Sequence, residues 1–279
     1  MLTVDGSAGS ALPSGGITFN ASDGADVLNL IGTSGVDSAS FSATQIAFNG
    51  VVIAHSNLEK RSYVTGGGLD NVSVSGSSMS FDSSQRLGQL LLSGSGSATV
   101  AAGGTNLLVL NTLAIDGTSK LDLNDNDLVV NNEYFSTILD LVLSGFGAST
   151  GITGSTSDGS QILALFDNAL VGAGDWSGVP ISANAIVGKY TFFGDANIDG
   201  QVSGDDYTII DANLNTAPAA GLEWLSGDMN LDGTVTGDDY TVIDANLGLG
   251  DGNPLSAASF NQPGLIPLSL RRDASELLW

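Results

Sequence analysis

The sequence contains no cysteine and very few basic residues. Its 279 residues include 30 Asp and Glu, only 7 Lys and Arg, and 1 His, which gives a formal net charge of −23. The absence of cysteine excludes disulfide bonds and thiolate metal ligands. The acidic excess repels phosphate backbones, and it therefore argues against a nucleic-acid partner. Cations are the natural counterparts of such a chain.

Long apolar runs and catalytic side chains are also scarce. No run approaches the roughly 18 apolar residues of a membrane-spanning helix, so no membrane span is expected. The single histidine, His55, follows the apolar run VVIA, which fits a sheet residue better than a catalytic base. The basic residues of the strand-like region are Lys60, Arg61, Arg86 and Lys120, and none lies in an acidic cluster. Because no nucleophile or acid–base pair can be identified, the sequence predicts a protein that is not an enzyme.

Short strand-like segments dominate residues 1–190. Segments such as ITFN, NVSVS and KLDL alternate apolar and small polar residues, and Gly, Ser, Asn or Asp separates most of them. Stacked short strands with small-residue corners favour a parallel β-helix, since Asn-Gly hairpin turns are missing between most strands. An antiparallel β-sandwich gives nearly the same pattern and stays the alternative. Residues 1–190 are therefore expected to form a mainly β scaffold.

A helical pattern interrupts this scaffold near residues 133–144. The residues expected on its apolar face are Tyr134, Ile138, Leu141 and Val142. Gly145 is placed to end the helix. A helix at this point is expected to cap the strand array and to protect its edge strands from pairing with other chains.

Two acidic segments near the end of the chain repeat each other. Residues 194–214 read GDANIDGQVSGDDYTIIDANL, and residues 227–247 read GDMNLDGTVTGDDYTVIDANL. In each segment, side-chain oxygens occur at positions 1, 3, 5, 9 and 12, counted from its first Asp. Glycine stands at position 6, where the chain must turn. This is the spacing of an EF-hand calcium loop, with Asp instead of Glu at position 12.

The spacing predicts two calcium ions, one in each loop, held by oxygen ligands. At position 7 the ligand is a backbone carbonyl. The expected ligands of the first loop are Asp195, Asn197, Asp199, Gln201, Ser203 and Asp206. Those of the second loop are Asp228, Asn230, Asp232, Thr234, Thr236 and Asp239.

Each loop is followed by the pattern of a short helix. SGDD and TGDD fit a capping box, in which Ser or Thr and a later acidic residue satisfy the first backbone N–H groups. The apolar stripes expected on the two helices are Tyr207, Ile210 and Leu214, and Tyr240, Ile243 and Leu247. Val202 and Val235, at loop position 8, are expected to join the paired loops in a short two-stranded contact.

This tandem of loop–helix units, over residues 191–250, resembles the type I dockerin modules of secreted bacterial proteins. The resemblance implies two calcium ions, a pseudo-twofold pair of helices and an extracellular or cell-surface location. It also implies a cohesin-like partner. Cellulosomal dockerins place hydroxyl residues at positions 10 and 11 and basic residues soon after. Here these positions are Gly-Asp in both loops, and no Lys or Arg lies between Lys189 and Arg271.

Two functions fit these observations. The first is a secreted, calcium-stabilised structural protein that forms an extracellular filament, surface layer or matrix from identical subunits. The tail, residues 251–279, carries Arg271 and Arg272 and apolar groups that suit docking on an acidic groove, either of a neighbouring copy or of its own chain. The alternative is a dockerin-like recognition module of a carbohydrate-active or adhesive protein, with a cohesin-like or polysaccharide partner.

Two further sets of residues have simple structural explanations beside functional ones. A third calcium site is conceivable at Asp122, Asp125 and Asp127, but turn-forming acidic residues beside two strands explain this cluster better. Sugar stacking is conceivable at Trp176, Trp224 and Trp279, but scattered aromatic residues are more often part of a core.

Overall fold

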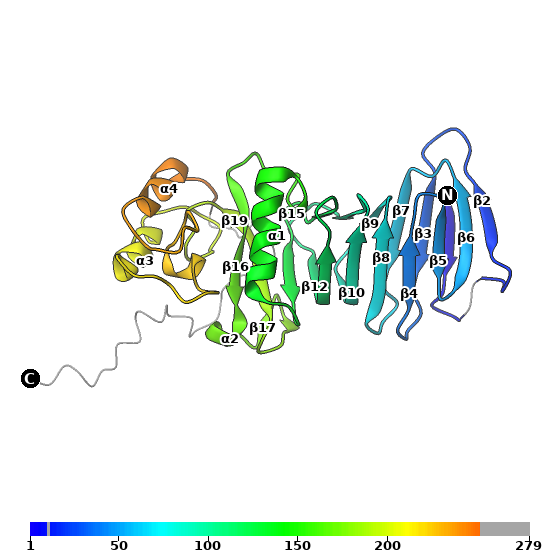
Figure 1. Ribbon diagram of the computed structural model, residues 1–279, viewed down its shortest axis with the longest axis horizontal. Coiled ribbons are helices and arrows are strands. Elements are labelled where there is room, and N and C mark those ends of the chain that lie inside the picture. Colours follow the sequence, from blue (N-terminus) through cyan, green and yellow to red (C-terminus); the bar gives the residue numbers. More distant parts are fainter. Residues whose placement is uncertain (10–11, 252–279) are drawn as a thin grey trace, which may run out of the picture.

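The structure is a computed structural model that describes residues 1–9 and 12–251. Two large sheets form the N-terminal region, and a small helical region lies at the opposite end of the long axis (Figure 1). The first sheet has 7 strands. Their spatial order is β1 (Leu2–Asp5), β3 (Val27–Ile31), β7 (Lys60–Val64), β9 (Ser78–Phe81), β11 (Ser97–Val100), β13 (Lys120–Asp122) and β15 (Gly151–Thr153). All of its neighbouring strands run parallel.

The second sheet has 10 strands and is mixed. Their spatial order is β16 (Gln161–Asp167), β19 (Ile186–Phe192), β14 (Asp127–Val130), β12 (Leu107–Ile115), β10 (Gln85–Ser93), β8 (Asp70–Ser75), β4 (Ser38–Phe41), β5 (Gln45–Phe48), β6 (Val51–Ser56) and β2 (Ile17–Asn20). Antiparallel pairing occurs around β5 and around β19, while the strands between them are parallel.

Successive strands from β7 to β16 alternate between the two sheets. Each of β9 to β14 pairs in parallel with the strand that lies two before it in sequence. The prediction of a mainly β region is therefore confirmed, and most of its neighbouring strands pair in parallel, unlike those of an antiparallel β-sandwich. Neither sheet closes on itself, since each has two edge strands.

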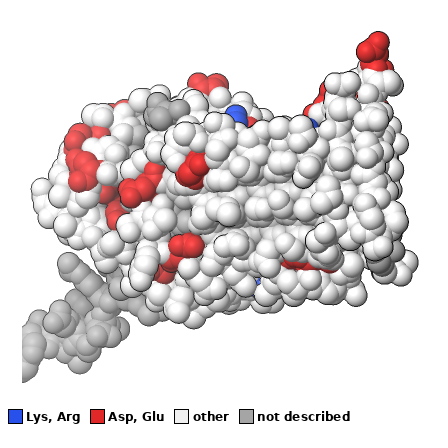
Figure 2. Space-filling model, turned by 45° about the vertical axis from the view of Figure 1, so that its right-hand side comes forward, with Lys and Arg blue, Asp and Glu red and all other residues white. Residues whose placement is uncertain are grey.

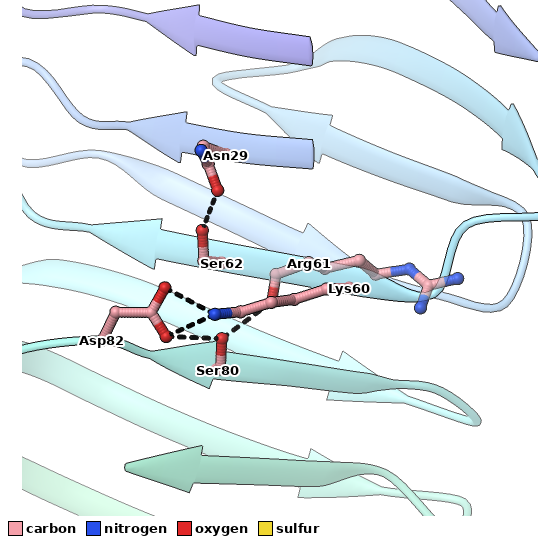
Figure 3. Close-up of polar contacts among 6 residues, drawn as sticks. All are labelled: Asn29, Lys60, Arg61, Ser62, Ser80 and Asp82. Carbon is pink, nitrogen blue, oxygen red and sulfur yellow. Dashed lines mark hydrogen bonds and ion pairs between the residues drawn. The ribbon is translucent and has the colours of Figure 1, made fainter. Parts of the chain in front are cut away.

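The core lies between the two sheets because each strand alternates its side chains. In β8, Val72 and Val74 are buried, whereas Asn71 and Ser75 are exposed. The outward positions of the first sheet carry small polar residues and one ion pair, between Lys60 and Asp82, with 2.8 Å between Nζ and Oδ2 (Figure 3).

The expected helix near residues 133–144 is α1 (Phe135–Ala148), which packs against the edge strand β15. Ile138 and Val142 are buried, but Tyr134 is 81% exposed at the N-cap, so its place on the apolar face was wrong. Gly145 does not end the helix either. A Cβ there would lie 1.6 Å from the carbonyl oxygen of Ile152, so glycine allows the helix to approach the strand closely.

Short elements complete the described chain. They are α2 (Asn168–Val171), the two-stranded sheet of β17 (Asp175–Trp176) and β18 (Val179–Pro180), α3 (Asp206–Asn213), the 3₁₀ helix η1 (Trp224–Ser226) and α4 (Asp239–Asn246). None of the helices in the described residues combines the length and the apolar character needed to cross a membrane. The predicted tail contacts of residues 252–279 lie outside the described residues.

Candidate metal centre

The first acidic loop is positioned by β19, which is the last strand of the second sheet in chain order. Strand β19 ends at Phe192, and Asp195 follows three positions later. The Thr191 hydroxyl donates a hydrogen bond to the Asp195 carboxylate, and the Trp224 indole N–H donates to the Asp195 carbonyl at 2.7 Å. All three residues are buried. The position-1 carboxylate is therefore fixed by the strand before the loop and by η1.

The carboxylate at position 12 closes each loop. In the first loop, Asp206 Oδ1 accepts the backbone N–H of Ala196 at 2.8 Å, and Oδ2 accepts that of Ser203 at 2.8 Å. Asp239 makes the equivalent contacts in the second loop. Because the same side chain reaches both ends of its loop, the predicted ligand positions are brought together on one turn of chain.

The curvature of the loops requires left-handed backbone at two positions. Gly200 and Gly233, at position 6, have φ values of 89° and 93°. Position 4 is also left-handed, with φ of 54° at Ile198 and 58° at Leu231. Such angles are rare for a β-branched residue. Ile198 is buried, and this burial offsets part of the strain. Nothing in the sequence singled out position 4.

Buried carboxylates dominate the electrostatics of both loops. Burial is the main cause that raises the pKa of Asp195 to about 7 and that of Asp206 to about 6. Burial also raises the pKa of Asp228. In the second loop, Asp228 and Asp239 are fully buried, and within residues 1–9 and 12–251 neither forms an ion pair with a basic side chain. A buried carboxylate is costly unless a cation compensates it, so this set fits a hard divalent cation.

The fit of the two loops to a divalent cation depends on a mixed set of oxygen donors rather than on a cluster of carboxylates. Among the described residues, no three His, Cys, Asp or Glu side chains converge as a metal-binding group. The position-3 amides instead contact carboxylates at position 11. Asn197 Nδ2 donates to Asp205 at 3.0 Å, and Asn230 Nδ2 donates to Asp238 at 3.1 Å. The sequence interpretation did not include Asp205 or Asp238, although each stands directly before a predicted ligand.

The two units are interlocked about a pseudo-twofold axis. Val202 donates its N–H to the carbonyl of Leu249, at 2.9 Å, and Val235 donates to that of Thr216, at 2.8 Å. The predicted contact between the two position-8 valines was therefore wrong. Each valine pairs instead with the segment that follows the helix of the other unit.

The helices meet through one tyrosine from each unit. The rings of Tyr207 and Tyr240 stack with 6.1 Å between centroids, and each hydroxyl donates to an aspartate of the opposite helix, Asp244 or Asp211. Ile210 and Ile243 are buried as expected.

The helix ends differ from the predicted pattern. Leu214 and Leu247 are 41% and 55% exposed, because they lie at the C-caps rather than on the packed face. The predicted capping boxes are not formed, because the N-cap residues of α3 and α4 are Asp205 and Asp238, and neither helix has a side-chain cap hydrogen bond. Asp206 accepts the N–H of Ser203, but the Ser203 hydroxyl donates to Asp205.

Comparison with known proteins identifies this pair of loop–helix units. Residues 193–248 match the family model described as the Dockerin type I domain. This segment is a dockerin type I domain. It lies C-terminal to the β-rich region, as the repeats predicted. Type I dockerins typically bind calcium, and the dockerin match indicates an extracellular protein. No curated protein and no solved structure matches the chain.

The dockerin is packed directly against the β-region. The Asp167 N–H donates to the Gly221 carbonyl at 2.9 Å. The ring of Phe193 lies 5.2 Å from that of Phe146 on α1 and 6.1 Å from that of Trp224. These contacts join α1, the entry to the first loop and η1. The orientation of the dockerin is thereby tied to the sheets.

A buried lysine of the second sheet lies near Asp195, the first residue of the first acidic loop. Lys189, on β19, is fully buried, and desolvation lowers its pKa, while the nearby Asp127 and Asp195 oppose that shift. No sequence signal marked this residue, because its acidic neighbours come together only in the fold.

The other predicted clusters have structural roles. Asp122 accepts the N–H of Ser155 at 3.0 Å, and Asp127 accepts the indole N–H of Trp176 at 2.9 Å. Asp125 accepts the N–H of Gly103 at 2.8 Å. N–H donors thus engage all three carboxylates, which favours the turn explanation over a third calcium site.

Two tryptophans and the single histidine belong to the interior of the described residues. Trp176 and Trp224 are buried and cannot serve as open sugar platforms, and Trp279 lies outside the described residues. His55 is also buried, in β6, and desolvation lowers its pKa. In Figure 2 the acidic side chains gather over the dockerin end, while the broad face of the β-region is largely uncharged.

Proposed function

We propose that the dockerin domain binds two calcium ions and attaches the β-region to a cohesin-like receptor outside the cell. The observation that carries this proposal is the complete repetition of the loop contacts. Position 12 closes both loops, position 4 is left-handed in both, and each unit pairs with the other. Each ion would be held by the six predicted ligand residues of its loop.

Calcium would compensate the buried carboxylates and would thereby stabilise the dockerin. Metal binding to the folded state alone adds directly to folding stability. The exposed surface beside the loops carries further acidic residues, among them Asp205, Asp211, Asp238 and Asp244. A receptor with basic residues on its facing surface would suit this side of the dockerin.

The β-region would then be the part of the protein that the dockerin holds at the receptor. We propose that it is a rigid, non-catalytic scaffold whose alternating parallel strands form the coils of a β-helix. The dockerin match favours this recognition function over the filament of identical subunits, which no observation on the described residues supports.

Calorimetric titration of protein stripped with EDTA tests the metal sites. We expect two calcium ions per chain, and none after the double change Asp195→Ala and Asp228→Ala. Asp140→Ala, an exposed acidic residue of α1, is the matched control and should leave both sites intact. Unchanged calcium binding in the double variant would exclude the predicted ligands.

The receptor proposal needs a separate measurement. Type I cohesin domains can be immobilised as a panel, and the full chain passed over them with calcium or with EDTA. Binding to at least one cohesin that is lost in EDTA supports the proposal. Two bound calcium ions without any cohesin binding would retain the metal sites and reject the receptor.

A further inference from the structure

A cavity of about 290 Å³ lies where α1 meets the end of the first sheet, and none of its lining residues is a predicted calcium ligand. It is lined by residues of α1, β13, β15, β16 and β19, among them Lys120, Phe146, Gln161 and Tyr190. Its volume is close to the lower end of the range for small-molecule sites, which suits one ring-sized group. The close approach at Gly145 and Ile152 sets the wall between the helix and the strand.

The cavity lining is divided between apolar and hydrogen-bonding groups. Val142, Ile162 and Leu163 supply aliphatic surface, and Thr153 and Ser157 supply hydroxyls. Phe146 is 59% exposed, and its ring packs against that of Phe193 at an interplanar angle of 69°. It therefore presents a fixed aromatic surface at the cavity, on which the apolar face of a sugar ring can be buried.

Two N–H donors of the lining are not engaged within the described part of the chain. Gln161 uses its Oε1 to accept the Tyr190 hydroxyl at 3.2 Å, and no hydrogen bond is recorded for its Nε2. The Lys120 ammonium has neither an ion pair nor a hydrogen bond among residues 1–9 and 12–251. Unused donors at a cavity favour a ligand rich in acceptor oxygens.

Lys60, another lysine of the first sheet, provides a comparison because it is neutralised within the protein. It lies on the outward face of β7, and Asp82 neutralises it with contacts of 2.8 and 2.9 Å (Figure 3). Lys120 lies on β13 of the same sheet, yet the nearest acidic residue on its own strand, Asp122, accepts the N–H groups of Asn124 and Ser155. In a chain with 30 acidic residues, a lysine that lines a cavity and forms no ion pair within the described residues can pair with the carboxylate of a ligand.

We propose that this cavity binds a carboxylate-bearing sugar, namely a uronic acid unit of a polysaccharide. Lys120 and Gln161 would bind the carboxylate. Thr153 and Ser157 would form hydrogen bonds with the ring substituents, and Phe146 would pack against the apolar face of the ring. The site belongs to the β-region, and it does not depend on the calcium or cohesin proposals.

Chemical-shift titration of the full chain, saturated with calcium, tests the site with two simple probes. Methyl glucuronide should bind with a Kd of about 1 mM, and neutral methyl glucoside about tenfold more weakly. Lys120→Gln should weaken glucuronide binding about tenfold, because it removes one charge-assisted contact. Lys120→Arg should restore most of the affinity, and the control Lys60→Gln should leave it unchanged.

Several results would overturn the proposal. They are no glucuronide binding up to about 50 mM, equal affinity for the glucoside, or an equal loss in Lys120→Gln and Lys60→Gln. Equal loss would mean that only overall charge matters. Thermal unfolding of each variant shows whether it is folded, and Gln161→Ala provides a second change that keeps the charge. This variant should lose about threefold in affinity.

Discussion

Substitution of the glycine before the second calcium loop should separate two costs that the structure makes visible. Gly227 has φ of 93°, and a Cβ there would lie 2.9 Å from Ile210 Cγ1 and 3.1 Å from the Ile210 backbone. The left-handed backbone costs an alanine about 1–2 kcal/mol. Crowding against a packed helix adds about 1–3 kcal/mol. Gly227→Ala should therefore lower the free energy of unfolding of the dockerin by about 2–5 kcal/mol.

Gly248→Ala is the matched control for this prediction. Its φ is 85°, but no atom lies within 4 Å of the position of its Cβ, so it should show the backbone cost alone. Urea unfolding in saturating calcium, followed by the fluorescence of the buried Trp224, measures both variants. Gly194→Ala should match Gly227→Ala, since its Cβ would lie 3.0 Å from Ile243. An equal effect of Gly227→Ala and Gly248→Ala would refute the interlocked packing of the two units.

Three other changes test separate parts of the structure. Gly145→Ala should destabilise the β-region by about 3 kcal/mol or more, measured by thermal unfolding, because its Cβ would overlap the Ile152 carbonyl. A loss below about 1 kcal/mol would contradict the helix–strand contact. Trp224→Phe should weaken one calcium site about fivefold in calorimetry and spare the other, because it removes the hydrogen bond to Asp195. Equal weakening of both sites would exclude this local role. Asp70, on β8, is buried, and burial raises the pKa of its carboxyl group. The contribution of Asp70 to folding stability is therefore full below about pH 4, and it declines as the pH rises through the raised pKa of the folded state. The stability of Asp70→Asn relative to the unchanged protein should therefore increase above about pH 4 in urea titrations at several pH values, and a constant difference would contradict this.

The dockerin domain was predictable because the pattern of its two acidic loops is local in sequence. Oxygen-bearing side chains at alternate positions and a glycine at the turn identify a loop without knowledge of its neighbours. The same reasoning found the two helices, since each begins at the last residue of its loop. It failed at Leu214 and Leu247, because periodicity alone does not show where a helix leaves the core.

The pairing of the strands was less accessible from the sequence. Alternation of apolar and polar residues has the same period in parallel and antiparallel strands, so it does not distinguish a β-helix from a β-sandwich. The place of α1 was recognisable, but its end was not. A glycine at position 145 is typical of a helix end. In the structure, however, the absence of a side chain lets the helix pack against the carbonyl of Ile152, and this contact joins two segments that are separate in the sequence.

The two calcium loops differ more in the fold than in the sequence. Asp195 is held by Thr191 from the second sheet and by Trp224 from η1, and it lies near the buried Lys189. Both Asp195 and its counterpart, Asp228, accept hydrogen bonds from the backbone of their own loops, so the contacts with Thr191 and Trp224 are what distinguishes the first loop. The first loop is therefore built into the β-region, whereas the second is connected to it mainly through the other unit. A chain that repeats one calcium loop twice thus uses the first copy to fix the dockerin on its scaffold and the second to complete the symmetric pair.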